Sequence, residues 1–398
     1  MVLGAGFNRF GQFMSIPFLA IYLSTTSDLS NTLIGVIIAC GPLAGVITGF
    51  YGGVLSDHWK RKDLLIISSV VVTIAYGLFF QLNSPIAIAV TNLVFGMASA
   101  VFEPVLMAAC RDTGEKEKIQ KAMILRYTSI NVAAAIAPLI GGYLATSSSP
   151  KIVFLLASIL SALLVVAVSM TRFNVSSKPS QAQSLVTALK AVITDRAFSL
   201  YIIAFTLVLF AYAFTTSALS LQLLEQYGSA NKTTELTSIW SRYWSHQLNG
   251  PELFSILLVV NAISVLLFQG PMSYWLRRES PLNKLLKSGL VMSLGYAVLI
   301  IPLDSYHQFF LAIVVICAGE SVMFPITTIV TDDITPPSQR GRYYGAAGFK
   351  KLGFVLAPPL GGYILDNFTP SILWIIACIS SLLALLISIY ASNLSKPQ

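Results

Sequence analysis

The sequence predicts an all-α membrane protein in which twelve transmembrane helices form two pseudo-symmetric six-helix halves. Of its 398 residues, 55% are apolar and only 11% are charged, whereas charged residues make up about a quarter of a soluble domain. The apolar residues fall in twelve runs that are long enough to cross a bilayer. Short patterns in the first half of the chain also recur in the second half, in the same order. Lipid must therefore be the solvent for much of the protein surface.

Each predicted span is a run of about 20 mostly apolar residues, the length that crosses roughly 30 Å of hydrocarbon. The first run is expected to be a span rather than a cleaved signal peptide, because it lacks a basic leader and carries Asn8 and Arg9. The first six spans are expected at residues 1–23, 31–55, 63–82, 86–110, 120–146 and 151–171. The other six are expected at residues 197–221, 253–276, 283–303, 307–331, 341–365 and 370–391.

The predicted domains are an N-terminal six-helix half at 1–171 and a C-terminal six-helix half at 197–398. A polar, serine-rich cytoplasmic linker at 172–196 joins them. Residues 224–252 are predicted to form a long outer loop. Its aromatic side chains are expected at the level of the lipid headgroups, with a lid over the substrate as the alternative; they are Trp240, Tyr243 and Trp244.

The basic residues predict the orientation, because positive charge stays on the cytoplasmic side during insertion. Most of the 25 Lys and Arg residues lie in the loops after spans 2, 4, 6, 8 and 10. The opposite loops contain only Lys151, Lys232 and Arg242. Both termini are therefore predicted to be cytoplasmic, in a multi-pass protein of the cell inner membrane, since the compact loops suggest a bacterial source. This distribution also accounts for the net charge of +8 without a nucleic-acid partner.

Three sequence patterns are repeated at a spacing of about 220 residues, and a six-plus-six repeat around a central cavity is a recurrent transporter plan. "FEPVLMAACRD" at 102–112 corresponds to "MFPITTIVTDD" at 323–333. "APLIGGYL" at 137–144 corresponds to "APPLGGYI" at 357–364. "GVLSDHWKR" at 53–61 has a divergent counterpart, "GPMSYWLRR", at 270–278.

The loop between spans 2 and 3 resembles the major facilitator loop motif, roughly G-x-x-x-D-R-x-G-R-[RK]. Gly53, Asp57, Arg61 and Lys62 match it, whereas His58 and Lys60 replace the usual Arg and Gly. Span 5 resembles the Pro-Gly motif associated with antiporters at Pro138, Gly141 and Gly142, with alanines at two usual glycine positions. The chain is most similar to the twelve-helix drug–proton antiporters of this superfamily, the multidrug efflux type.

The resemblance implies a gating role for the loop motif. Gly53 would let two helices approach closely, and Asp57 would face the positive N-terminal end of span 11. Arg61 would reach Asp112 at the end of span 4. Together these contacts would hold the cytoplasmic side closed in the outward-facing state. The alternative is that the segment is only a solvated basic loop.

Six charged residues are predicted inside the spans, where an ionised side chain costs roughly 2.5–3.5 kcal/mol on insertion scales and is a functional candidate. Arg9, Glu103 and Arg126 belong to the first half. Glu103 and Arg126 are predicted at a similar depth, about 10 Å from the cytoplasmic end at 1.5 Å per residue, so the two can pair. Such a pair would serve either as a structural ion pair or in substrate or proton binding.

Glu320 lies near the middle of span 10, beside Gly319 and before Pro325. A carboxylate in an apolar cavity is suited to proton coupling, because desolvation disfavours its charged form. Lys350 and Lys351 of span 11 are the alternative partners that would hold it ionised. The six charges sum to +2, which favours an anionic or zwitterionic solute over a cationic drug.

The leading hypothesis is a proton-coupled antiporter that exports amphipathic small molecules or drugs by alternating access. The alternative is a carrier for a specific anionic metabolite or siderophore. No G-x-x-x-x-G-K-[ST] or H-E-x-x-H motif occurs, and the three histidines, His58, His246 and His307, are dispersed. The sequence therefore predicts a monomeric transporter in the lipid bilayer, not an enzyme, ATP-driven pump or channel, with no metal or other cofactor.

Overall fold

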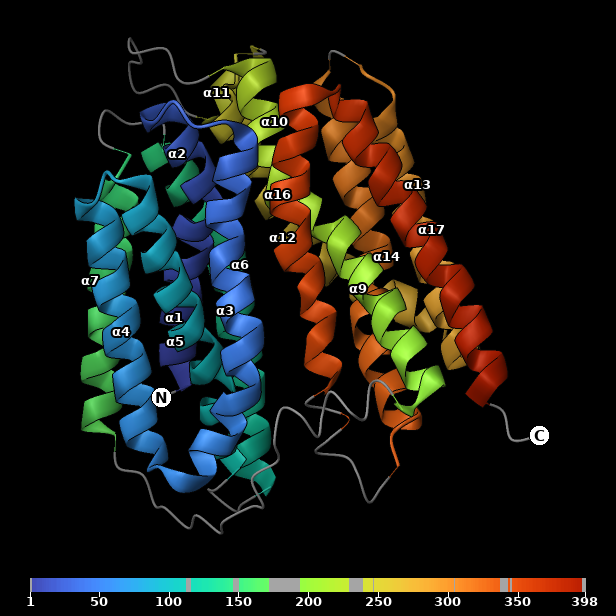
Figure 1. The fold of residues 1–398 in the computed structure, drawn as a ribbon, viewed down its shortest axis with the longest axis horizontal. Helices are drawn as coiled ribbons and strands as arrows, with labels where there is room; N and C mark the ends of the chain where they lie inside the picture. The colour runs from blue at the N-terminus through green and yellow to red at the C-terminus, as the bar shows by residue number, and fades with distance from the viewer. Residues whose placement is uncertain are drawn as a thin grey trace. The chain divides into compact units, whose positions relative to one another are not determined.

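The computed structural model describes residues 2–111, 116–145, 150–171, 194–228, 239–245, 247–303, 305–336, 343 and 346–395, and these contain helices and no strand (Figure 1). The first group of helices is α1 (Val2–Ser15), η1 (Ile16–Phe18), α2 (Leu19–Thr26), α3 (Asn31–His58), α4 (Arg61–Gln81), α5 (Pro85–Arg111), α6 (Lys116–Ala145) and α7 (Ile152–Met170). The second group is α9 (Arg196–Thr216), α10 (Ala218–Tyr227), α11 (Ile239–Trp244), α12 (Gly250–Trp275), α13 (Pro281–Ile300), α14 (Tyr306–Asp333), η3 (Gly348–Lys351), α16 (Leu352–Asn367) and α17 (Pro370–Ser395).

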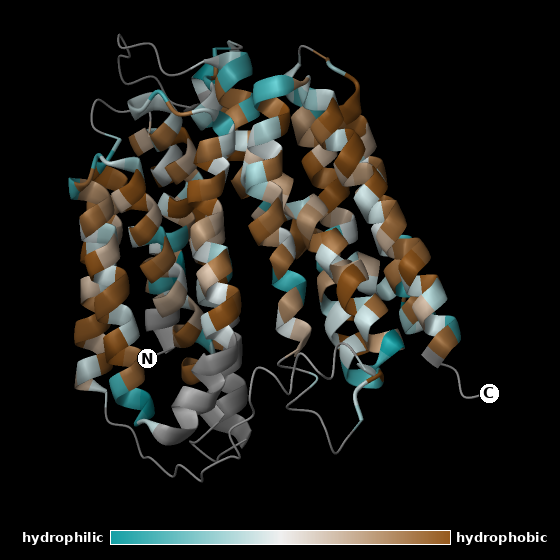
Figure 2. Cartoon of the chain, in the orientation of Figure 1, coloured by the Kyte–Doolittle hydropathy of each residue, from teal (hydrophilic) through white to brown (hydrophobic). Residues whose placement is uncertain are grey.

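The long helices of the described residues overlap the predicted spans, so the predicted class of membrane protein is confirmed. Two details differ: the short helix α11 lies within the predicted outer loop 224–252, and α16 begins at Leu352, inside the span predicted at 341–365. Nine of the helices in this part of the chain are long and apolar enough to cross a membrane, and Figure 2 shows hydrophobic residues along the length of these helices. The first predicted span is interrupted, because α1 gives way to the 3₁₀ turn η1 at Pro17 before α2 continues. Proline has no N–H to donate, so a short 3₁₀ turn is a common way to accommodate it.

The described helices belong to two compact units, one formed by residues 1–182 and 219–259 and the other by 183–218 and 260–398. In the first unit, α1 packs on α6 and α7, α3 packs on α5, and α4 packs on both α5 and α7. A buried apolar cluster joins α4, α5 and α7, with Leu65, Phe102 and Leu164 among its members. Gly96 of α5 lies directly against the backbone of Gly41 in α3, and such small residues let membrane helices approach closely.

In the second unit, α9 packs on α16 and α17, and α13 packs on α14 and α17. Here too glycines mark the close contacts: Gly319 of α14 lies against Ser288 of α13, and Gly353 of α16 lies against Phe210 of α9. The predicted division into six-helix halves stays a prediction. Residues 172–193 of the predicted linker lie outside the described residues.

Candidate functional site

The first unit contains a cluster of three ionised side chains from three helices. Glu103 of α5 pairs with Arg126 of α6 and also with Arg9 of α1, whose Nη2 lies 3.4 Å from Glu103 Oε2. All three side chains are partly buried. The predicted pair between Glu103 and Arg126 is therefore confirmed, and Arg9 is a third member that the sequence did not place there.

This cluster carries one more positive than negative charge. Arg9 Nη1 donates to Gln12 Oε1 over 2.9 Å, which fixes one guanidinium without neutralising it. The neighbouring Asn8 is buried. One carboxylate is shared between two guanidinium groups, so one positive charge of the arginines is not neutralised within the cluster. An arginine offers planar, forked N–H donors that match carboxylate and phosphate groups, so the cluster is chemically suited to bind an anionic group.

Glu320 of α14 lies in the second unit in a different environment. It is buried, with 8% of its surface exposed, and Asn261 Nδ2 of α12 donates to its Oε2 over 3.1 Å. The Tyr212 side chain of α9 lies within hydrogen-bonding reach of the same carboxylate. No Lys or Arg forms an ion pair with Glu320 among the residues that the structure describes.

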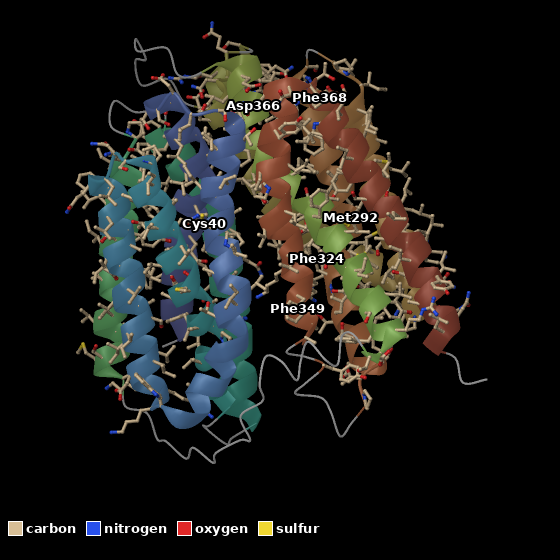
Figure 3. The ribbon with its side chains drawn as sticks, viewed as in Figure 1. Cys40, Met292, Phe324, Phe349, Asp366 and Phe368 are labelled. Atoms are coloured by element: carbon tan, nitrogen blue, oxygen red, sulfur yellow. The ribbon has the colours of Figure 1, made fainter. Side chains whose placement is uncertain are left out.

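Tyr212, which lies near this carboxylate, packs against two phenylalanine rings. The Tyr212 ring meets the Phe324 ring of α14 edge to face at 5.1 Å and lies 6.4 Å from the ring of Phe354. Figure 3 labels Phe324. Tyr296 of α13 is fully buried, is an electrostatic neighbour of Glu320, and its hydroxyl has no hydrogen-bond partner within the described part of the chain. Among the described residues, the Glu320 carboxylate is therefore buried, accepts a hydrogen bond from a neutral amide and has no cationic partner.

Asn261 and Tyr212 were not predicted from the sequence. The sequence does mark them as polar residues in the middle of predicted apolar spans. Neutral polar residues are common in such spans, however, and only the folded contacts select these two. Asn261 also lies 2.9 Å from the sulfur of Cys317, so its amide joins α12 to α14 at two points.

Lys350 and Lys351 lie in the 3₁₀ turn η3, immediately before α16. Lys350 is half-buried and Lys351 is exposed. The structure shows no ion pair between either lysine and Glu320. A role for the two lysines in substrate or proton binding stays a prediction.

The loop motif lies at the end of α3 and the start of α4. Gly53 and Asp57 are in the last turns of α3, where the side chains are outside the described part, as is the whole of Asp112. Arg61 is the first residue of α4. Lys62 Nζ donates to the Ser169 carbonyl over 2.6 Å, which ties α4 to the end of α7. The predicted contacts of Asp57 and Arg61 stay predictions.

The Pro-Gly motif lies within α6, where Pro138 is buried. A side chain at Gly141 would collide with the Met14 carbonyl and the Phe18 ring, at the point where α1 meets η1. A side chain at Gly142 would collide with Ser255 in the first turns of α12. Both glycines therefore allow close helix packing inside the first unit.

Comparison with known proteins identifies one family of transporters along the whole chain. The sequence pattern of the Major Facilitator Superfamily matches residues 1–241 and again residues 233–398. An MFS-type transporter of Bacillus subtilis (strain 168), YqjV, is 28% identical over 372 residues, which cover 92% of this chain and 86% of that protein. The solved structure of the nucleoside transporter NupG superposes with a TM-score of 0.72 at 16% identity, covering 100% of this chain and 98% of that one.

Two further relatives carry functional names. The Na(+), Li(+), K(+)/H(+) antiporter of Planococcus maritimus is 25% identical over 377 residues, which cover 90% of this chain and 87% of that protein. Multidrug resistance protein 1 of Bacillus subtilis (strain 168) is 22% identical over 351 residues, covering 85% of this chain and 82% of that protein. The helices, the repeated motifs and these matches agree: the chain is a membrane transporter and not an enzyme, and it belongs to the Major Facilitator Superfamily.

Proposed function

We propose that this transporter is a proton-coupled antiporter that exports amphipathic small molecules, drugs among them, by alternating access. The observation that carries the proposal is the environment of Glu320. Its carboxylate is buried, accepts a hydrogen bond from the neutral amide of Asn261, and has no cationic partner among the described residues. Burial of an unpaired charge is unfavourable, and proton uptake removes that charge.

Glu103 is less suited to this role in the arrangement described above. Two guanidinium groups contact it, and nearby positive charges favour the ionised form of a carboxylate. We assign Glu103 to holding the arginines in place, and Arg9 and Arg126 to contact with the substrate. Glu320 would then be the residue that takes up and releases the coupled proton.

The named relatives support an antiport mechanism at low identity. One carries the name of a cation/proton antiporter and another that of a multidrug resistance protein. In the proposed cycle two six-helix halves alternate around a central substrate site, with both termini in the cytoplasm of a bacterial cell and one chain as the working unit. The loop motif at Gly53, Asp57 and Arg61, with Asp112, would hold the cytoplasmic side closed in the outward-facing state.

A second candidate is a carrier for a specific anionic metabolite or siderophore. The observation that favours it is the excess guanidinium charge of the cluster formed by Arg9, Glu103 and Arg126. Both candidates use the same fold, and they differ in the charge of the transported molecule.

Transport by the purified full chain in proteoliposomes separates the two candidates. A pH gradient is imposed, and uptake of a lipophilic cation dye and of a radiolabelled tricarboxylate is followed in parallel, with protein-free liposomes as the control. Gradient-driven flux of the dye, with proton movement in the opposite direction, is the result expected of the proposed antiporter. Flux of the tricarboxylate alone would reject drug export and support the anion carrier.

A further inference from the structure

The loop between α12 and α13 differs chemically from the loop of which it is the repeated copy. In the pattern "GPMSYWLRR" at 270–278, Tyr274 stands at the position that Asp57 holds in "GVLSDHWKR" at 53–61. The copy has arginines at its last two positions and two aromatic residues before them. Without the carboxylate it cannot repeat a latch that relies on Asp57, so Arg277 and Arg278 are free of that role.

Tyr274 and Trp275, the last two residues of α12, have exposed rings, and a cation lies over each ring. Tyr274 and Trp275 are 66% and 60% exposed, whereas Leu276 between them and the arginines is buried and anchors the turn. The Arg277 guanidinium lies over the Tyr274 ring at 4.2 Å from its centroid, and Lys287 Nζ lies 5.7 Å from the centroid of Trp275. The aromatic rings and the basic side chains are therefore in contact and form a single surface.

Within residues 274–287, Glu279 is the only acidic residue, and it is already paired. The Glu279 carboxylate accepts hydrogen bonds from Lys287 Nζ at 2.5 Å and from Asn283 Nδ2 at 2.9 Å. The hydrogen bond from Lys287, followed by that from Asn283, lowers the pKa of Glu279, so it stays ionised at neutral pH and neutralises Lys287. Among the described residues no carboxylate pairs with Arg277, Arg278 or Lys284, so three positive charges are available to a ligand.

The apolar surface next to these charges is that of a membrane helix. On α12, Leu266 and Leu267 are exposed about two turns before the aromatic pair, and on α13, Leu290 and Leu294 are exposed beyond the lysines. An exposed apolar face, then aromatic rings, then cations is the order in which a phospholipid presents acyl chains, interface and phosphate. Clusters of basic residues at this depth attract anionic headgroups.

We propose that the surface formed by Tyr274, Trp275, Arg277, Arg278 and Lys284, here called the α12–α13 surface, binds the phosphate headgroup of an anionic phospholipid. The lipid comes from the leaflet on the basic side of the protein, which the charge distribution predicts to be cytoplasmic. The arginines contact the phosphate, the rings lie at the ester level, and the acyl chains lie along the exposed leucines.

Lipid retention by the purified full chain tests the proposal without measuring transport. The protein is equilibrated in detergent micelles that contain radiolabelled phosphatidylglycerol and an excess of phosphatidylcholine, and the lipid bound per chain is counted after gel filtration. The unmodified protein is expected to retain phosphatidylglycerol in preference to phosphatidylcholine. The double variant Arg277→Gln/Arg278→Gln is expected to lose at least about fivefold of that preference, since each basic residue near an anionic surface contributes roughly this factor.

The matched control is Arg196→Gln. Arg196 also lies over an exposed tyrosine ring, that of Tyr390 at 5.8 Å, but it stands outside the surface. This variant is expected to retain the lipid normally, and Arg277→Lys/Arg278→Lys to retain most of it, which separates loss of charge from misfolding. Equal retention by the unmodified protein and the double glutamine variant, or equal loss in the control, would overturn the proposal. Displacement of the lipid by glycerol phosphate at equal concentration would also overturn it, because the site would then belong to a soluble anion.

Discussion

Glu103 and Glu320 are both carboxylates inside membrane helices, yet their surroundings differ in kind. Glu103 is shared by two arginines, whereas Glu320 accepts a hydrogen bond from the neutral Asn261 amide and pairs with no cation among the described residues. The sequence predicted the pairing of Glu103 with Arg126, because depth along a helix follows from residue spacing. It did not predict the contact with Arg9, because spacing fixes depth but not which helices are neighbours.

Asn261 is expected to position the Glu320 carboxylate through its hydrogen bond. The change Asn261→Leu keeps a similar volume and removes the donor 3.1 Å from Glu320 Oε2. We expect expression to be retained, and the pH dependence of proton-driven transport to change, since a hydrogen bond to a charged group is worth about 1.5–3 kcal/mol. Initial rates across a pH series check this, with Asn261→Gln as the conservative comparison. A pH profile identical to that of the unmodified protein would contradict the assignment.

A second prediction concerns a buried ion pair in the first turn of α12. Arg242 of α11 pairs with Glu252, which is only 3% exposed and also accepts a hydrogen bond from the Asn249 backbone N–H. Arg242→Leu leaves this carboxylate without a cation, and breaking a buried pair typically costs about 3–5 kcal/mol.

Thermal unfolding in detergent checks the prediction. The single variant is expected to melt at a clearly lower temperature than the unmodified protein. The double variant Arg242→Leu/Glu252→Leu is expected to recover much of the loss, because it leaves no unpaired charge. A single variant as stable as the parent would show that the pair contributes little.

At the scale of the element, the helices were predicted well and their interruptions were not. Hydropathy alone placed the spans near α3, α4, α5, α7 and α17, because a helix that crosses the bilayer needs about 20 mostly apolar residues. The change to a 3₁₀ turn at Pro17 was not predicted, although proline interrupts the hydrogen-bond ladder. Pro138 lies inside α6, and that helix is continuous. The presence of a proline therefore does not by itself predict whether a helix is interrupted.

The Pro-Gly motif gives an element-level prediction about packing. Gly141→Ala would place a methyl group against the Met14 carbonyl and the Phe18 ring, and overpacking typically costs about 1–3 kcal/mol. The expected result is a lower melting temperature. Gly270→Ala in α12 is the matched control, because an added Cβ there meets nothing within 4 Å and alanine favours a helix by roughly 0.8–1 kcal/mol. Equal effects of the two changes would show that α6 does not depend on close approach at Gly141.

At the scale of the whole molecule, the family assignment follows from features spread along the chain. The repeated motifs in the two halves predicted a six-plus-six transporter, and the superfamily pattern matches both parts. The substrate could not be predicted in the same way, because it depends on a few side chains whose contacts arise only on folding. The surroundings of Glu320 show this, since Tyr212, Asn261 and Tyr296 come from three different helices.

The loop motif makes a prediction about the transport cycle. If Asp57 holds the cytoplasmic side closed, Asp57→Asn should impair cycling and leave expression intact, since a latch worth about 1–3 kcal/mol is enough to bias a two-state equilibrium. Transport rates per molecule of purified protein check this, with Asp63→Asn in the first turn of α4 as the neighbouring control. Normal transport by Asp57→Asn would reduce the motif to a solvated basic loop.

If Glu320 carries the coupled proton, as we propose, proton release on substrate addition measures this role directly. The unmodified protein, Glu320→Gln and the control Asp366→Asn, an exposed carboxylate of the same unit (Figure 3), are reconstituted in parallel with a pH-sensitive dye. We predict that the transported substrate releases protons from the unmodified protein and from Asp366→Asn but not from Glu320→Gln. Undiminished proton release from Glu320→Gln would contradict the account and transfer the coupling role to Glu103.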